Sequence, residues 1–168
     1  MTNSEPDYSY KIETLSTGYA TSHDGSGLKV LASGMSATLG CGKLTCLIGV
    51  NGAGKSTLLR TMARLQPQVS GSIELMGKPL QDYDPKQLSQ LVSVVLTDEV
   101  PEQALTAYEL VAMGRIPYTG YWGTLKKRDI RIVEQSLEMV GMTEFRHRRL
   151  HSLSDGERQK LMIAKALA

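Results

Sequence analysis

The segment LTCLIGVNGAGKST, at residues 44–57, constrains the fold of this chain more than any other stretch. The apolar run Leu44–Gly49 at its start predicts a fully buried parallel strand. A glycine-rich turn follows and leads into Ser56–Leu65, which we predict to be helical. A strand, a glycine-rich loop and a helix in this order are typical of an α/β fold in which the loop opens the helix.

The loop GVNGAGKST matches the pattern G-x-x-x-x-G-K-[S/T]. Glycines let backbone N–H groups turn inward around phosphates, and the N-terminus of the helix adds a partial positive charge. Lys55 is predicted to reach the β- and γ-phosphates of a nucleoside triphosphate, and the Ser56 hydroxyl to ligate Mg²⁺. The alternative is a glycine-rich turn that contains Lys-Ser by chance, expected in about one chain in a few hundred. The predicted nucleotide contacts are Gly49, Asn51, Gly52, Ala53, Gly54, Lys55, Ser56 and Thr57.

Composition limits the class of protein. A chain of 168 residues, 41% hydrophobic and 21% charged, is ordinary for one soluble domain. The formal net charge of +2 gives no strong electrostatic steering, so we expect no nucleic-acid partner. We also expect no signal peptide, no membrane span and no disulfide framework from Cys41 and Cys46. The basic run Arg146–Arg149 is interpreted as a solvated face rather than a metal-ligand cluster.

The remaining sequence divides into a strand-rich front and a helical stretch. Alternating or apolar runs predict strands over Tyr8–Leu15, Leu28–Leu39, Gly71–Gly77 and Val92–Leu96. Capping-box patterns predict that helices begin at Asp84–Gln87 and at Thr106–Glu109. Another helix is predicted by an apolar stripe at helical spacing, made of Ile130, Val133, Leu137 and Val140.

The pentapeptide LSDGE, Leu153–Glu157, allows two interpretations. Ser154 with Glu157 three residues later is an ordinary capping box. Together with the phosphate loop and the following RQKLMIAKALA, the pentapeptide resembles the Leu-Ser-Gly-Gly-Gln signature of ABC transporter ATP-binding subunits. The resemblance covers essentially the whole chain. It implies that the Ser154 hydroxyl and the Gly156 N–H contact the γ-phosphate of ATP held by a second subunit, with Asp155 as a departure.

Two further residues take roles from this resemblance. Tyr19, in LSTGYA, corresponds to the aromatic residue that stacks on adenine, although a core or cross-strand role is the alternative. Thr97 stands where the family usually has a glutamine that touches Mg²⁺. A threonine hydroxyl can ligate the metal but reaches less far, and a strand-ending turn is the alternative.

The resemblance implies an α/β P-loop NTPase core with an antiparallel β subdomain and a helical insert. We expect one ATP-binding domain over 1–168, with the core and β subdomain at about 1–97 and 154–168 and the helical subdomain at about 98–153. Family members continue after the signature with an aspartate, a glutamate and later a histidine that complete hydrolysis. Because none of these follows here, we expect a chain truncated after the signature, which binds ATP without hydrolysing it.

The implied function is the motor subunit of a membrane importer, in which Lys55 and Mg²⁺ serve ATP hydrolysis. Two copies would sandwich ATP beneath membrane permease subunits, at the cytoplasmic face of the cell membrane. The stretch AMGRIPYTGYWG, at residues 112–123, is similar to a loop in importers of ferric siderophores, haem and cobalamin, although an exposed aromatic loop is the alternative. The competing functions are a soluble P-loop kinase, an ABC ATPase outside transport, and a nucleotide-binding module without turnover.

Overall fold

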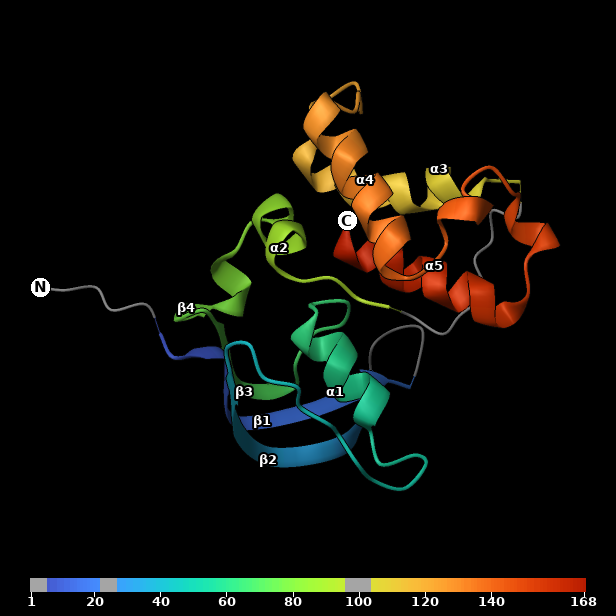
Figure 1. Ribbon diagram of the computed structural model, residues 1–168. Helices are drawn as coiled ribbons and strands as arrows, with labels where there is room; N and C mark the ends of the chain where they lie inside the picture. Colours follow the sequence, from blue (N-terminus) through green and yellow to red (C-terminus); the bar gives the residue numbers. More distant parts are fainter. Residues whose placement is uncertain (1–5, 22–26, 96–103) are drawn as a thin grey trace, which may run out of the picture. The chain divides into compact units, whose positions relative to one another are not determined.

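The computed structural model of this chain describes residues 6–21, 27–95 and 104–168. The chain groups into two compact units, Met1–Pro85 and Lys86–Ala168 (Figure 1). The division predicted from the sequence, with 154–168 assigned to the core, remains a prediction. Among the described residues, none of the helices combines the length and apolar character that crossing a bilayer requires.

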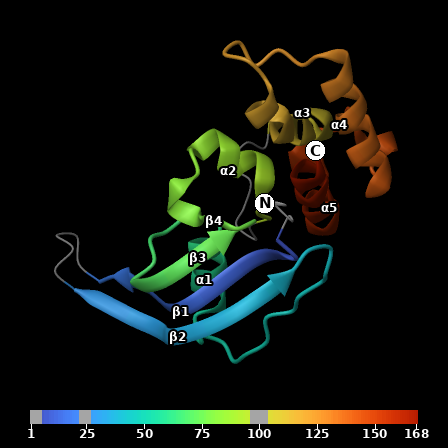
Figure 2. The same cartoon turned by 90° about the vertical axis from the view of Figure 1, so that its left-hand side faces the viewer.

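The first unit is built on an antiparallel sheet with strand order β2-β1-β3-β4 (Figure 2). Its strands are β1 (Tyr8–Ala20), β2 (Leu28–Gly40), β3 (Ser70–Leu75) and β4 (Lys78–Pro79). The three strands predicted from the front of the sequence are therefore confirmed. In β1, Ile12 and Leu15 are buried, as expected of a strand with one face on the core.

Helix α1 (Lys55–Met62) packs on this sheet and confirms the helix predicted after the glycine-rich loop. Its C-terminal end is tied to β1, because the Tyr10 hydroxyl donates to the Met62 carbonyl oxygen at 3.2 Å. Burial raises the pKa of Tyr10 to about 12. After β4 the chain forms the short 3₁₀ turn η1 (Leu80–Asp82) and helix α2 (Pro85–Leu91), which starts at the predicted proline.

Two predicted buried strands are wrong. No strand forms over Leu44–Gly49, where the Leu44 and Ile48 side chains are 94% and 90% exposed. Residues 92–95 also lack strand structure, and Leu96 lies outside the described residues. A strand needs at least one neighbouring strand to pair its N–H and C=O groups. Within the described ranges no strand pairs with either segment, so the apolar pattern alone does not produce a strand.

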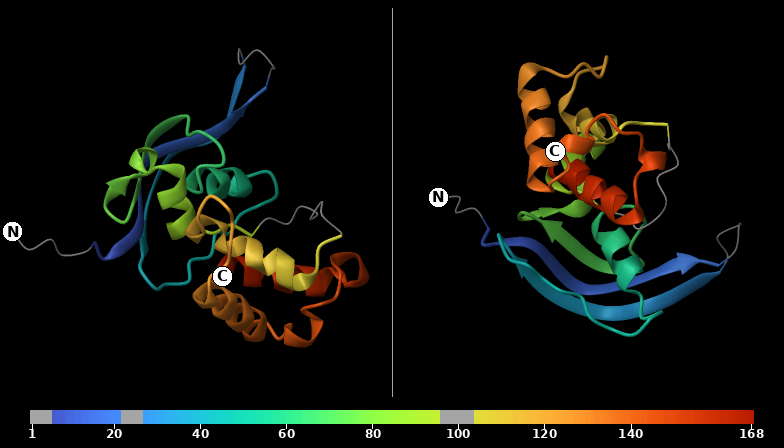
Figure 3. Two further views of the ribbon diagram at one scale, coloured as in Figure 1. Left: turned by 90° about the horizontal axis from the view of Figure 1, so that it is seen from above. Right: turned by 45° about the vertical axis from the view of Figure 1, so that its right-hand side comes forward.

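The second unit is helical (Figure 3). Its elements are α3 (Ala107–Ala112), η2 (Met113–Tyr118), α4 (Lys127–Met139), η3 (Thr143–Phe145), η4 (Leu150–Ser152) and α5 (Asp155–Leu167). The predicted capping box of α3 is confirmed, since the Glu109 carboxylate accepts from the Thr106 N–H at 2.8 Å and the Glu109 N–H donates to the Thr106 hydroxyl. The basic run at residues 146–149 is exposed, as predicted.

The core of this unit lies between α3, α4 and α5. Val133 and Leu137 of the predicted stripe are fully buried, whereas Ile130 stays 39% exposed at the edge of the contact. Gly114 permits a close approach of η2 to α5, because a Cβ atom there would lie 2.2 Å from the Lys165 carbonyl oxygen of α5. A side chain at this position would therefore push η2 and α5 apart.

Candidate nucleotide-binding site

The phosphate loop takes its shape from two glycines. Gly52 and Gly54 have φ angles of 82° and 88°, a region that L side chains rarely adopt. Between them the chain turns back, with the Ala53 N–H donating to the Val50 carbonyl oxygen at 3.3 Å. The backbone therefore favours glycine at both positions; the pattern predicted it at Gly54, whereas Gly52 stands at one of its unspecified positions.

The loop ends at the N-terminus of α1. Gly54 is the N-cap residue and offers no side chain to cap the helix, and the first turn holds no acidic residue. The first helical hydrogen bond is donated by the Leu58 N–H to the Gly54 carbonyl oxygen at 2.8 Å. The N–H groups of Lys55, Ser56 and Thr57 precede this bond, so they have no acceptor within the helix. Together with the helix dipole they form a site that favours an anion.

Lys55 supplies the cation of the loop. Its ammonium group donates to the carbonyl oxygens of Gly49 and Val50, at 2.7 and 2.8 Å. The side chain therefore folds back over the loop rather than extending into solvent. Phosphate oxygens would compete with these two neutral acceptors and form stronger, charge-assisted bonds. The predicted residues from Gly49 to Thr57 thus form one continuous segment that folds back on the Lys55 ammonium group and leads into α1.

Tyr19 lies near the end of β1, as predicted, and is 46% exposed. Its register partner on β2 is Lys29, whose ammonium group lies 6.0 Å from the centre of the Tyr19 ring. Two residues further along β2, Leu31 approaches Gly54, since a Cβ atom there would stand 3.2 Å from that of Leu31. Tyr19 and the end of the loop therefore meet the same stretch of β2. Adenine stacking on Tyr19 stays a prediction.

Ser154 and Glu157 form the capping box that the residues alone predicted. The Glu157 carboxylate accepts from both the Ser154 hydroxyl and the Ser154 N–H at 2.7 Å. The Ser154 hydroxyl in turn accepts from the Glu157 N–H at 3.4 Å. These hydrogen bonds, first that of the hydroxyl, hold the pKa of Glu157 below its usual value. The cap fixes the first turn of α5, whichever ligand the signature binds.

Asp155 departs from the first glycine of the usual signature, and its negative charge is compensated by a neighbouring residue. Its carboxylate forms an ion pair with Arg158 one turn later, and the Asp155 side chain is 96% exposed. Gly156 has open space around it, because a Cβ atom there would meet nothing within 4 Å. Packing within the second unit therefore does not require glycine at this position. A ligand that approaches the backbone closely would require it.

The sequence and fold of known proteins agree with this geometry. The profile of the ABC transporter family matches residues 32–168. The chain belongs to the ABC transporter family. It is 41% identical over 158 residues to an uncharacterized ABC transporter ATP-binding protein of Methanocaldococcus jannaschii, covering 94% of this chain and 52% of the relative. It is 37% identical over 161 residues to the iron(3+)-hydroxamate import ATP-binding protein FhuC of Bacillus subtilis, covering 95% and 57%.

The fold is also that of solved ABC ATP-binding domains, which confirms the predicted P-loop α/β class. A dimeric ATP-binding cassette in a post-hydrolysis state, bound to ADP and phosphate, superposes with a TM-score of 0.76 at 22% identity. That superposition covers 95% of this chain and 69% of the cassette. The chain spans about half the length of the curated relatives it matches.

One hydroxyl beside the phosphate loop is suited to a metal ion. Ser56 places a hydroxyl at the exposed start of α1, next to the phosphate loop. Mg²⁺ commonly takes few protein ligands together with substrate phosphates, so this single hydroxyl suits a phosphate-bound ion. Thr97 lies outside the described residues. Within the described ranges, no group of three or more His, Cys, Asp or Glu side chains is arranged to hold a metal by itself.

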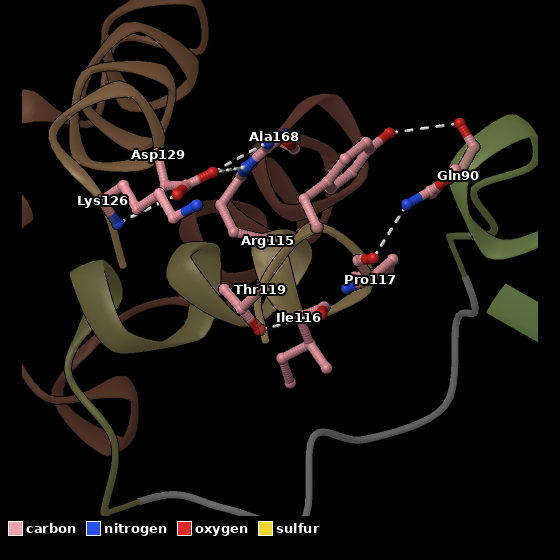
Figure 4. Close-up of polar contacts among 9 residues, drawn as sticks. Gln90, Arg115, Ile116, Pro117, Thr119, Lys126, Asp129 and Ala168 are labelled. Carbon is pink, nitrogen blue, oxygen red and sulfur yellow. Dashed lines mark hydrogen bonds and ion pairs between the residues drawn. The ribbon is translucent and has the colours of Figure 1, made fainter. Parts of the chain in front are cut away.

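Sequence reasoning missed one polar cluster of the ABC chain, in the stretch similar to the importer loop. Arg115 of η2 pairs with Asp129 of α4, with its Nη2 atom 2.9 Å from Oδ1 and both side chains 8% exposed (Figure 4). Arg115 also donates to the Ala168 carbonyl oxygen and stacks 3.9 Å from the centre of the Tyr118 ring. No local signal in the sequence marks this pair, because its residues are 14 positions apart and meet only when η2 packs against α4.

Proposed function

We propose that this chain is the nucleotide-binding part of the motor subunit of an ABC importer and that its ligand is Mg-ATP. The observation that carries the proposal is the phosphate loop, in which two glycines with positive φ precede an uncapped helix N-terminus. Lys55 adds the one side-chain charge on the loop itself. Backbone donors, helix dipole and ammonium group together favour a di- or triphosphate over a single carboxylate.

Each site residue has a distinct role in this proposal. Lys55 would exchange its two carbonyl partners for phosphate oxygens, and Ser56 would hold Mg²⁺. When bound, the ion would neutralise charge on the phosphates. Tyr19 would offer its exposed ring to adenine.

The signature would act on a second copy of the subunit. In this proposal Ser154 and the Gly156 N–H meet the γ-phosphate of ATP bound to the partner's phosphate loop. The exposed start of α5 and the open space at Gly156 support this role. Asp155, paired with Arg158, would leave the phosphate contact to its neighbours.

The proposed solute is a ferric siderophore, haem or cobalamin. Support comes from the likeness to FhuC and from the stretch at residues 112–123. We propose that the subunit works as a homodimer bound to permease subunits, at the cytoplasmic face of the membrane. The dimeric state of the similar cassette bound to ADP and phosphate supports the proposed homodimer.

We further propose that the 168 residues bind Mg-ATP without hydrolysing it. Hydrolysis needs a carboxylate that aligns water on the γ-phosphate as well as a held metal ion. The loop segment 49–57 itself carries no acidic residue, and the first turn of α1 has none. The test is a titration with a fluorescent ATP analogue, combined with steady-state phosphate release. Saturable, Mg²⁺-dependent binding without release is expected, and release that depends on Lys55 would contradict the absence of turnover.

A soluble P-loop kinase is separated from an importer subunit by ATP-dependent dimerisation rather than by ATP binding, which both share. A kinase would transfer phosphate to a second substrate and would not depend on Ser154. An importer subunit should dimerise on ATP through the signature, so the sedimentation of the ATP-bound chain with and without the Ser154 hydroxyl decides between them. No binding of ATP by the folded chain would contradict the proposal as a whole.

A further inference from the structure

The loop between η2 and α4 presents two large aromatic side chains at its tip. The Gly123 N–H donates to the Gly120 carbonyl oxygen at 2.9 Å, which closes a four-residue turn with Tyr121 and Trp122 at its centre. Their side chains are 96% and 87% exposed, and their rings meet edge to face with centres 5.4 Å apart. The centre of a turn usually holds Gly, Pro, Asn, Asp or Ser. Packing within the unit does not explain two aromatic residues there.

Both ends of this loop are held in place. The Asp129 carboxylate accepts from the Lys126 N–H at 3.0 Å, at the start of α4, and pairs with Arg115 of η2. On the η2 side, the Tyr118 hydroxyl donates to the Gln90 carbonyl oxygen at 3.1 Å (Figure 4). The turn therefore projects from a fixed base, and Figures 1 and 2 show this loop at the outer end of the helical unit.

The charges around the turn have one sign. Residues 119–131 contain one acidic residue, Asp129, and its carboxylate is buried and paired. The cations of the same stretch are all exposed: Lys126, Lys127, Arg128 and Arg131. A hollow of about 390 Å³ adjoins them, lined by Arg115, Tyr118, Lys126, Arg128, Asp129 and Ile132. The chain has a formal net charge of only +2, so this surface is a local concentration of positive charge.

We propose that this surface, residues 119–131, docks directly on an anionic phospholipid membrane. Trp and Tyr side chains favour the interface between headgroups and acyl chains, where a ring is apolar on one side and wet on the other. Lys and Arg beside them attract phosphate headgroups, and their stems lie along apolar surface. The proposal requires neither ATP nor the phosphate loop, so it stands or fails independently of the proposed function.

A lipid surface matches the observations better than an acidic protein segment. The aromatic pair stands on a projecting turn rather than in an apolar groove, and a flat interface accepts a projection. The adjoining hollow is lined mainly by charged side chains, which suits headgroup phosphates rather than the apolar anchors of a helix.

Trp122 is the single tryptophan of the chain, so its fluorescence reports on this turn alone. The chain would be mixed with vesicles of phosphatidylcholine, or of equal parts phosphatidylcholine and phosphatidylglycerol. With the anionic vesicles we expect flotation of the protein, a blue shift of the emission and quenching by brominated acyl chains. Raised salt should weaken all three effects, because screening shortens the reach of the charges.

Two charge-matched variants test the location. The triple variant Lys126→Gln, Lys127→Gln, Arg128→Gln removes three cations of the surface. Each cation near an anionic membrane is worth about a fivefold gain, so the loss of affinity should be about a hundredfold. The control, Lys43→Gln, Lys86→Gln, Lys160→Gln, removes three exposed cations elsewhere and should retain binding. Tyr121→Ala and Trp122→Ala should weaken flotation while the overall charge is unchanged.

Three results would overturn the proposal. One is the absence of both flotation and blue shift with anionic vesicles. Another is an equal loss of vesicle affinity in the two triple variants, which would show that the attraction depends on the overall charge of the chain and not on this surface. The third is tight binding of an acidic peptide to this surface without any vesicle binding, which would assign it to a protein partner. Matching far-UV circular dichroism spectra of all variants ensure that a loss reflects the surface and not unfolding.

Discussion

The ammonium group of Lys55 lies 2.7 Å from the carbonyl oxygen of Gly49, across the phosphate loop that both residues belong to. The cation is therefore already positioned at the loop before any nucleotide arrives. Ordering this long side chain is a cost that binding then largely avoids.

Replacement of Lys55 by Ala should lower the affinity for ATP. The variant loses the side-chain cation of the loop, and a charge-assisted contact to phosphate is worth at least about a tenfold change in Kd. Titration with a fluorescent ATP analogue measures the effect. Lys43→Ala, which removes an exposed lysine before the loop, is the matched control and should bind normally. An unchanged Kd for Lys55→Ala would show that the loop binds phosphate by its backbone alone.

Ser154 allows its structural and ligand-binding roles to be separated. Ser154→Ala removes an N-cap and should destabilise the chain by about 1 kcal/mol, whereas Ser154→Gly should cost only a few tenths. Both variants lack the hydroxyl, so both should lose ATP-dependent dimerisation if the signature binds in trans. Thermal melts and sedimentation measure the two properties. Normal dimerisation of the glycine variant would restrict Ser154 to capping.

Local signals predicted much of this fold. The capping boxes at Thr106 and Ser154 are encoded within four residues each, and the structure forms both. The positive φ angles of Gly52 and Gly54 are likewise a local property of the loop, since glycine adopts them without steric cost. The segment Leu44–Gly49 fails for the opposite reason, because a strand depends on partners that its own residues do not specify.

The buried pair of Arg115 and Asp129 was beyond sequence reasoning as well. Its residues are 14 positions apart and meet only after η2 and α4 pack. Nothing local distinguishes Asp129 from an ordinary acidic residue in a first helical turn. The loop residues of the site could thus be predicted, whereas the tertiary contact that holds the helical unit could not.

Acidification should destabilise the helical unit. The Lys126 N–H and the Arg115 guanidinium hold the pKa of Asp129 below its usual value, and Thr106 does so for Glu109. Because these folded pKa values lie below the unfolded ones, the stabilisation is complete above the unfolded pKa and is lost as the pH falls through the folded pKa. Melting curves recorded by far-UV circular dichroism should therefore shift downward between about pH 5 and pH 3. The double variant Asp129→Asn, Glu109→Gln should have a lower melting temperature at neutral pH, and that temperature should fall less on acidification. If the melting temperature of the variant falls with pH as steeply as that of the wild type, the assignment to these two carboxylates is refuted.

Gly114→Ala should destabilise the packing of η2 on α5. The added Cβ would stand 2.2 Å from the Lys165 carbonyl oxygen, a backbone atom that cannot rotate away. Overpacking of this kind costs about 1–3 kcal/mol. Gly120→Ala is the control, since a Cβ there meets nothing within 4 Å. Equal urea midpoints for the two variants would mean that the helices adjust freely.

The exposed segment Leu44–Gly49 should promote association. Leu44, Ile48 and Val50 are 94%, 90% and 78% exposed, next to backbone groups that no strand pairs. The double variant Leu44→Ser, Ile48→Ser should remain monomeric up to a higher concentration than the wild type, as measured by light scattering. The control is Leu65→Ser with Met139→Ser, two isolated exposed apolar residues. A wild-type chain that stays monomeric at high concentration would contradict this expectation.

The irregular pairing of β1 with β2 has a consequence for fibril formation. Their register shifts at four places, Thr14 has a φ of 46°, and Figure 3 shows both strands strongly curved. A bent edge does not present a straight row of donors and acceptors to an incoming strand. The outer edge of β2, which pairs with no other strand among the described residues, is therefore a poor template for cross-β growth. Assembly of this chain into aggregates should instead be amorphous and nucleated at residues 44–50 rather than along the sheet.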